Sequence, residues 1–212
     1  MSKIFLTSDT HFGHDREFLW GPRGFKSSKE HDEAVIANWN SVVGPDDDVY
    51  VLGDLMLGDN EHGKACVERL NGRIHLIRGN HDRDWIKKVD LSKFFVSNEN
   101  LSFISDGKHR ITVCHYPMMS WPHMSTNGYM VFGHIHHNTD AVYWPIIEQS
   151  ELMLNAGVDI NGFMPVTFEE MVENNINHKI KTASHRIVRE NLGLFTMAEN
   201  LKEKVDDLLS DE

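Results

Sequence analysis

Five short clusters of polar residues carry the side-chain types that bind transition metals. In chain order they are Asp9-Thr10-His11, Gly53-Asp54, Gly79-Asn80-His81-Asp82, His115 and Gly133-His134-Ile135-His136. A mixture of imidazole, carboxylate and amide oxygen donors suits divalent ions such as manganese, iron, cobalt, nickel or zinc. The glycines let the backbone turn sharply and approach an ion or a phosphate closely. Taken together, the five clusters predict a metal site.

Each cluster directly follows a predicted strand. The strands are short apolar runs that end in polar residues, and we expect them at residues 3–8, 48–52, 73–77, 110–114 and 129–132. In open α/β sheets, ligand sites gather where the carboxyl ends of strands meet the loops. The topology therefore brings the five clusters to one edge. A single Asp or His at a strand end is usually an ordinary turn residue, so the prediction depends on the whole set.

Helices are expected between the first strands. Ser27 and Glu30 form a capping box. The residues after it place apolar side chains on one helical face, namely Val35, Ile36, Trp39, Val42 and Val43. A second, short helix is expected at residues 65–70. Because strands alternate with helices here, the sequence predicts βαβ units and a partly parallel sheet.

The middle of the chain has a different pattern. Asp106-Gly107 separates apolar runs at residues 101–104 and 110–114, which is a strong hairpin signal. Residues 152–155 form one more predicted strand. Two packed sheets with helices outside them would suit this order of elements.

The length of 212 residues fits one domain with an extension. We expect the main domain at residues 1–175 and a C-terminal extension at residues 176–212. In the extension, Thr196 and Glu199 form a capping box that opens an acidic amphipathic helix. We expect this extension to pack on the same domain.

The composition is that of an ordinary globular protein, with 40% apolar and 25% charged residues. No apolar run reaches the roughly 18 residues of a membrane-spanning helix, and the amino terminus does not resemble a signal peptide. The two cysteines, Cys66 and Cys114, form no disulfide framework. We therefore expect a cytoplasmic protein.

The net charge is −11, from 21 basic and 32 acidic side chains. A protein that grips nucleic acid through its phosphates needs a basic face, so this balance argues against nucleic acid as a partner. The 14 histidines point instead to metal or proton chemistry, because imidazole is a common metal ligand that titrates near neutral pH.

The five clusters match, in order, the motifs D-x-H, G-D, G-N-H-D/E, H and G-H-x-H of the calcineurin-like metallophosphoesterases. The chain resembles this family over residues 4–159, and in particular its small stand-alone bacterial and phage members. The resemblance implies an α/β fold, a four-layer α/β/β/α sandwich of two mixed β-sheets flanked by helices. It also implies a phosphoester hydrolase that uses two divalent metal ions, with manganese expected first and iron, zinc, nickel or cobalt as alternatives.

The resemblance assigns the metal ligands. It places one ion on Asp9, His11 and His136. It places the other on Asn80, His115 and His134, with Asp54 shared by both ions. Two ions about 3.5–4 Å apart need a shared carboxylate to offset their repulsion, and together they can activate a bridging water at neutral pH.

The resemblance also implies that His81 is the general acid. Cleavage of a phosphoester requires a proton for the leaving oxygen, and an uncoordinated histidine near the ions can supply it. Asp82 either orients His81 for this role or only caps the turn.

Three further residues are candidates for substrate binding. Arg16 and Arg23 lie in the loop after the first ligands, where an arginine could pair with a phosphate or could simply be solvated. His123 ends the bulky segment 116–123, which follows His115. This segment could form the wall of a substrate pocket or fill the core.

These observations favour a phosphodiesterase that acts on small substrates such as cyclic nucleotides. A phosphomonoesterase or protein phosphatase is the alternative, but the arginine that such phosphatases carry after Gly-Asp is absent, because Leu55 follows Asp54 here. A nuclease is disfavoured by the charge. A non-catalytic scaffold, like the small retromer subunit with its degraded metal site, is disfavoured by the intact ligand set. We expect the protein to bind a small phosphoester substrate and no membrane. Whether it forms a homo-oligomer is left open.

Overall fold

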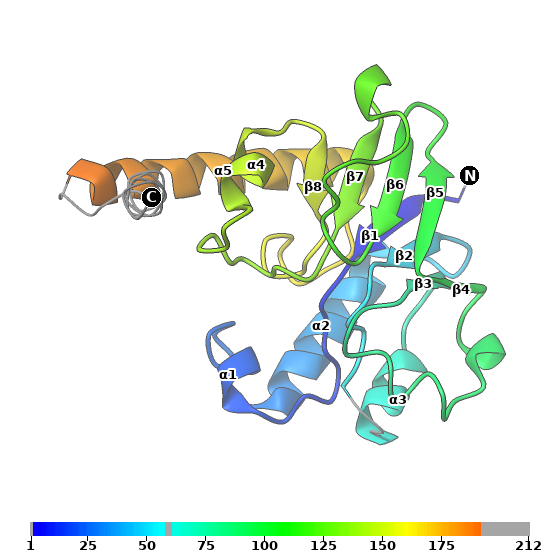
Figure 1. Ribbon diagram of the computed structural model, residues 1–212. Coiled ribbons are helices and arrows are strands. Elements are labelled where there is room, and N and C mark those ends of the chain that lie inside the picture. Colours follow the sequence, from blue (N-terminus) through cyan, green and yellow to red (C-terminus); the bar gives the residue numbers. More distant parts are fainter. Residues whose placement is uncertain (1, 58–60, 192–212) are drawn as a thin grey trace, which may run out of the picture. The chain divides into compact units, whose positions relative to one another are not determined.

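The computed structural model describes residues 2–57 and 61–191, and it divides the chain into two compact units, Met1–Asn175 and Ile176–Glu212 (Figure 1). The first unit contains both sheets. In the second unit the described residues all belong to helix α5 (Phe168–Asn191), which begins in the first unit. The capping box predicted at Thr196 and the acidic helix after it lie outside the described residues.

The first sheet contains the strands that precede three of the five clusters. Its order is β1 (Ile4–Thr7), β2 (Asp48–Val51), β3 (Arg73–Ile77) and β4 (Ser97–Glu99), and every neighbouring pair is parallel. The sequence predicted the first three strands. It did not predict β4, because Ser-Asn-Glu has no apolar residue to mark it as a strand. The carboxyl ends of β1, β2 and β3 therefore meet at one edge.

The second sheet has the order β5 (Leu101–Ser105), β6 (Arg110–Cys114), β7 (Tyr129–Phe132) and β8 (Met153–Asn155). The predicted hairpin is confirmed, since β5 and β6 are antiparallel. The pairs β6–β7 and β7–β8 are parallel. The expected fold class, α/β with two packed sheets, is thus confirmed, although the first sheet is wholly parallel rather than mixed.

The main helix of the first sheet begins where the capping box predicts it. Helix α2 (Ser28–Val42) is capped by the Ser27 hydroxyl, which accepts a hydrogen bond from the Glu30 amide at 3.1 Å. Four of the five residues of the predicted apolar face are buried, including Trp39, which is fully enclosed, whereas Val42 is 36% exposed. The other helices are short: α1 (Glu17–Trp20), α3 (Glu61–Val67), α4 (Trp144–Gln149) and the 3-10 turns η1 (Leu91–Lys93) and η2 (Met124–Thr126). Helix α3 begins four residues before the predicted one.

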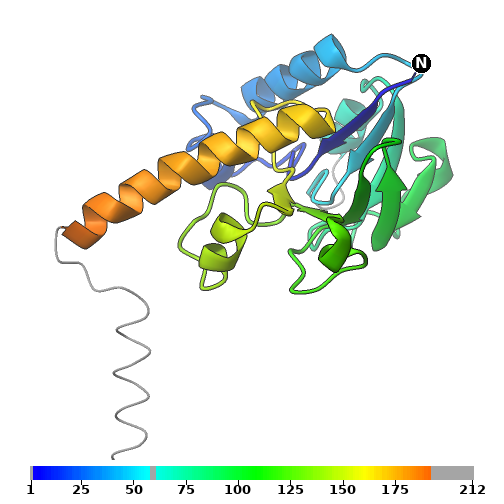
Figure 2. The same cartoon turned by 90° about the horizontal axis from the view of Figure 1, so that it is seen from above.

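Three apolar clusters hold the layers together. The first joins α2 and α3 to the first sheet, through residues such as Trp39 and Val51. The second lies between the sheets and contains Leu6 and Val131. The third joins the outer face of the second sheet to α4, around Trp144. Helices α2 and α4 thus lie on opposite outer sides of the paired sheets, as the view from above shows (Figure 2). Burial of these side chains is the main stabilising contribution to the fold.

Backbone hydrogen bonds join the loops at the carboxyl ends of the strands. The Asp9 amide donates to the Gly53 carbonyl at 3.0 Å and the His11 amide to the Asp54 carbonyl at 2.9 Å, which ties the loops after β1 and β2 together. The Gly133 amide donates to the His115 carbonyl at 2.9 Å and joins the loops after β7 and β6. Across the described ranges, no helix is both long and apolar enough to cross a membrane.

Candidate metal centre

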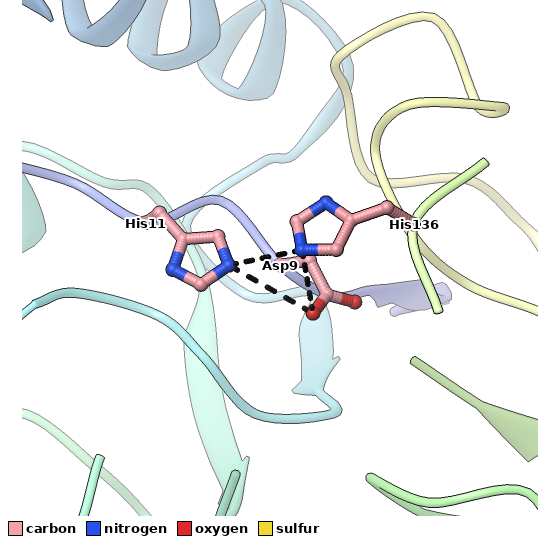
Figure 3. A group of neighbouring side chains, drawn as sticks. All are labelled: Asp9, His11 and His136. Carbon is pink, nitrogen blue, oxygen red and sulfur yellow. Dashed lines mark hydrogen bonds and ion pairs between the residues drawn. The ribbon is translucent and has the colours of Figure 1, made fainter. Parts of the chain in front are cut away.

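Asp9, His11 and His136 form a tight cluster although they come from loops after β1 and β7 (Figure 3). The two histidine Nε2 atoms are 3.3 Å apart. The Asp9 Oδ1 atom lies 4.0 Å from Nε2 of His11 and 3.8 Å from Nε2 of His136. Three donor atoms that face one another at these separations can surround one small cation.

The Asp9 carboxylate shows that this cluster suits a cation. Its side chain is fully buried, and burial raises its pKa. One oxygen, Oδ2, accepts a hydrogen bond from the His134 amide at 2.9 Å. The other, Oδ1, has no hydrogen-bond partner among the described residues. An orphaned, buried carboxylate oxygen is costly unless a cation pairs with it, so a metal ion fits this cluster.

A second cluster lies beside the first and brings together the residues predicted for the other ion. His115 Nε2 lies 3.0 Å from Oδ1 of Asn80 and 3.6 Å from Oδ1 of Asp54. The ring of His134 contacts the ring of His115 with 5.1 Å between their centroids. Burial, followed by the charge of His115, lowers the pKa of His134, which favours the neutral imidazole that metal ligation requires.

Asp54 lies between the two clusters. Its Oδ2 is 3.7 Å from Nε2 of His11, whereas its Oδ1 is 3.6 Å from Nε2 of His115. Its side chain is 3% exposed, so it is shielded from water on both sides. One carboxylate therefore presents one oxygen to each cluster, an arrangement that lets it be shared by two ions.

Five of the seven predicted ligands have left-handed backbone. They are Asp9 (φ 61°), His11 (φ 54°), Asp54 (φ 53°), His134 (φ 71°) and His136 (φ 52°). Each such residue costs on the order of 1–3 kcal/mol, and strained backbone of this kind clusters at functional sites. The His134–His136 segment is consequently bent rather than extended, which sends the two rings to different clusters.

Two glycines permit the close approach of the ligand loops. A Cβ atom at Gly79 would lie 2.2 Å from Oδ1 of Asp54. A Cβ atom at Gly53, whose φ is +88°, would lie 2.5 Å from Nδ1 of His115. Any side chain at either position would displace a predicted ligand, which is the physical reason for Gly in the Gly-Asp and Gly-Asn-His-Asp clusters.

An ion pair that the sequence did not predict holds His136. The His136 Nδ1 atom lies 2.8 Å from Oδ2 of Asp159, an interaction that fixes which ring nitrogen faces the cluster. Burial alone would raise the pKa of Asp159, but hydrogen bonds from His136 and His137 and the charge of Arg23 hold it well below its usual range. The signal that could have found Asp159 is its place shortly after β8, a strand that ends at the same edge.

Arg23 lies behind the ligands and not in a substrate pocket, which differs from the sequence-based expectation. Its guanidinium makes two hydrogen bonds of 2.9 Å to Asp159 and another of 2.8 Å to the Asp9 carbonyl. It also contacts His31 and His136, and its side chain is 2% exposed. Because these partners occupy the guanidinium, Arg23 positions His136 and the Asp9 backbone.

A backbone group holds His115 on the other side. Its Nδ1 atom lies 2.7 Å from the Leu52 carbonyl, so Nδ1 carries the proton and Nε2 is left to face Asn80 and Asp54. The sequence did not predict this interaction either, because any residue type could supply the carbonyl.

His81 lies at the mouth of the cluster. Its amide donates to Oδ1 of Asp54 at 2.9 Å, and its exposed ring lies 5.4 Å from the ring of His11 between centroids. His81 is thus near both clusters but outside each set of facing donor atoms. Its role as a general acid stays a prediction.

Asp82 does not orient His81. It is fully buried, and its carboxylate accepts from the amides of Asp54, Leu55 and Gly79 and from Nε1 of Trp85, at 2.7–3.1 Å. The predicted catalytic role is therefore replaced by a structural one. Asp82 joins the loops after β2 and β3, and so positions Asp54.

The remaining candidates for substrate binding are placed differently from one another. Arg16 is exposed before α1, and its role stays a prediction. His123 lies near Arg110, which begins β6, whereas the ligands follow the other end of that strand. This places His123 away from the clusters, contrary to expectation. Within segment 116–123, Met118 lines a cavity while Trp121 is buried in the core, so both interpretations hold for different residues.

The fold and the site define a two-sheet α/β protein with a candidate two-metal centre at the carboxyl ends of its strands. No family model matches the chain. It is 34% identical, over 175 residues, to the uncharacterised protein MJ1445 of Methanocaldococcus jannaschii, covering 82% of this chain and 91% of that one. The chain belongs to the same protein family as MJ1445.

Two other comparisons found a shorter sequence match and a match in fold. The Gene 66 protein of Mycobacterium phage L5 is 41% identical over 86 residues, which are 39% of this chain and 41% of the phage protein. The crystal structure of AQ665 from Aquifex aeolicus, a protein of unknown function, matches with a TM-score of 0.62 and 24% identity. That match covers 82% of this chain and 99% of AQ665, and it shows the same fold.

Proposed function

We propose that the protein is a phosphoester hydrolase with two divalent metal ions, most active with manganese and on small phosphodiesters such as cyclic nucleotides. The observation that carries the proposal is the placement of Asp54, whose two oxygens face two separate groups of nitrogen and oxygen donors. The orphaned Oδ1 of Asp9 supports the same interpretation. When bound, two such ions polarise a phosphoryl oxygen and activate water at neutral pH.

The chain's own residues account for the rest of the chemistry. Asp9, His11 and His136 would hold one ion, and Asn80, His115 and His134 the other, with Asp54 shared. Hydrolysis breaks a P–O bond, so the departing oxygen must gain a proton. His81 is exposed beside the clusters and carries an imidazole that can donate this proton.

The preference for diesters rests on one observation: among the described residues, no unpaired cation is hydrogen-bonded to a predicted ligand. A monoester dianion benefits from an extra positive group beside the ions. Within the described residues, Arg23 is the arginine that hydrogen-bonds to a predicted ligand, and Asp159 already neutralises it. A diester carries a single negative charge, which the ions can balance themselves.

The test compares kcat/KM for bis-p-nitrophenyl phosphate and p-nitrophenyl phosphate at one manganese concentration, followed by cyclic nucleotides. We expect the diester to be the better substrate by at least about tenfold, a difference of about 1.4 kcal/mol in transition-state stabilisation. The variant Asp54→Asn, purified in the same way, controls for a contaminating hydrolase. A clear preference for the monoester would favour the phosphomonoesterase alternative, and no turnover of either compound would contradict the proposal.

A further inference from the structure

A cavity of about 660 Å³ opens next to Asn80 and is lined by three cationic side chains. These are Arg78, Arg83 and Lys87, and apolar residues including Tyr116 and Met118 form the rest of its wall. In the described part of the chain, no acidic side chain lines this cavity. Three like charges around one cavity repel one another, and an anion bound among them would relieve that repulsion.

Two of these cations come from one turn whose backbone is anchored. Asp82 and Trp85 anchor the turn after Asn80, in which the Ile86 amide donates to the Asp82 carbonyl at 3.2 Å. Arg83 and Lys87 are four residues apart in this turn and both line the cavity. The structure records no ion pair for either of them within residues 2–57 and 61–191.

Arg78 is the third cation and is the most constrained. Its Nε donates to Oδ1 of Asn98 at 2.6 Å, which fixes the guanidinium plane while leaving its terminal nitrogens available. Asn98 belongs to β4, so the Arg78 side chain is held by the edge strand of the first sheet.

A second, apolar cavity of about 240 Å³ lies on the other side of Tyr116 and Met118, which line both cavities. It reaches His134 and is otherwise lined mainly by apolar side chains of the 116–119 segment and α4. Tyr116 is 46% exposed, so part of its surface is accessible to a ligand. The metal clusters are therefore flanked by a cationic cavity at Asn80 and an apolar, aromatic one at His134.

We propose that the substrate is a nucleotide diester with a second phosphate, which binds among Arg78, Arg83 and Lys87 while a base packs against Tyr116 in the apolar cavity. This proposal rests on the proposed function and narrows its substrate class. Aromatic and apolar surface binds a base through stacking, and charge-assisted hydrogen bonds hold a phosphate. The chain's net charge of −11 disfavours long nucleic acid, but the three cations give a dinucleotide or a strand end a local binding site.

The experiment measures kcat/KM for a thymidine dinucleotide that carries a 5′- or a 3′-terminal phosphate, relative to the unphosphorylated dinucleotide. We expect at least one phosphorylated form to be preferred by about 10- to 100-fold. The variant Arg83→Ala/Lys87→Ala should abolish most of that preference. The second phosphate could be a terminal monoester or the next diester of a strand. An unphosphorylated trinucleotide, which carries a second diester but no terminal phosphate, distinguishes these two sources when its kcat/KM is compared with that of the phosphorylated dinucleotides.

The matched control is Lys29→Ala/Lys93→Ala, which removes the same charge from exposed positions that line neither cavity. It should keep the wild-type preference. A wild-type enzyme without any preference would overturn the proposal. So would a double variant that lowers the rates for all dinucleotides and for bis-p-nitrophenyl phosphate equally, because the cations would then act on the scissile phosphate or on folding.

A binding measurement separates this proposal from the proposed function. With EDTA present, an NMR titration should show that the phosphorylated dinucleotide binds wild-type protein at least tenfold more tightly than the Arg83→Ala/Lys87→Ala variant. Equal binding would contradict the cationic subsite even if the protein hydrolyses diesters. Preserved binding without hydrolysis would instead contradict the proposed function alone.

Discussion

The two halves of the candidate metal centre use similar ligands but are held in place by different means. On one side, His136 is fixed by the carboxylate of Asp159, which is itself held by the buried guanidinium of Arg23. On the other side, His115 is fixed by the carbonyl of Leu52. The first half thus relies on a charged network between distant segments, whereas the second relies on the backbone of the sheet.

This difference predicts which half is more easily damaged by single substitutions. A buried ion pair leaves an uncompensated charge when one partner is removed, so the His136 half can be disrupted by changing one side chain. The carbonyl that holds His115 cannot be removed by substitution. Asp54 belongs to both halves and should be the most sensitive position of all.

The largest effect is expected from Asp54→Asn, which breaks both halves at once. Losing the shared negative charge leaves two cations facing each other, so hydrolysis of every substrate should fall on the order of 10⁴-fold. Steady-state rates across a manganese titration measure this, with His11→Gln as the comparison that damages one half. A smaller loss for Asp54→Asn than for His11→Gln would show that Asp54 does not bridge.

The second effect concerns His81, which belongs to neither half. His81→Ala should lower turnover of alkyl diesters by roughly 10²- to 10³-fold but affect p-nitrophenyl diesters little, because a good leaving group needs little proton donation. Both substrates are assayed with the metal content of the variant measured in parallel. Equal losses for the two leaving groups, with both metals retained, would rule against the acid role.

The third effect sharpens the comparison of the halves. Asp159→Asn should weaken metal binding in the His136 half by about 10- to 100-fold, the usual effect of removing the group that orients a ligating histidine. Calorimetric titration with manganese should then show one weakened and one nearly unchanged site. Asp106→Asn, which alters a carboxylate bound to His109 in the distant hairpin, is the matched control. Two equally weakened sites would mean that the halves are not supported independently.

The smallest effect is expected from Asp82→Asn, and it should appear mainly in stability. The Asp82 carboxylate accepts four N–H groups, so an amide there loses acceptors and should lower the free energy of unfolding by about 1–3 kcal/mol. Denaturant unfolding measures this, with the exposed turn residue Asp90→Asn as control. A variant that unfolds normally but behaves like His81→Ala towards alkyl diesters would restore the catalytic role predicted for Asp82.

Much of the fold could be predicted because its strands are apolar runs with clear ends. The bounds predicted at residues 73–77 and 129–132 are those observed for β3 and β7. Helix α4 was missed because six residues are too few to show a helical period. Helix α5 was missed because many polar residues follow Phe168 and Met171, which obscures its apolar side.

The sequence predicted which residues gather at the candidate site, but not the interactions that hold them in place. The ligands share one sheet edge, which follows from topology, and their residue types limit the chemistry. The pairing of Arg23 with Asp159 joins positions 136 residues apart, and each residue alone resembles an ordinary surface charge. The left-handed backbone at five ligands depends on the folded context, which residue spacing does not contain.

The number of metal ions bound per chain tests the central claim most directly. Protein stripped with chelator, dialysed against saturating manganese and analysed for metal should bind two ions, and the return of hydrolytic activity should follow their uptake. Asp54→Asn should bind fewer than two under the same conditions. Wild-type protein that binds at most one ion at saturation would contradict a centre in which Asp54 is shared by two metals.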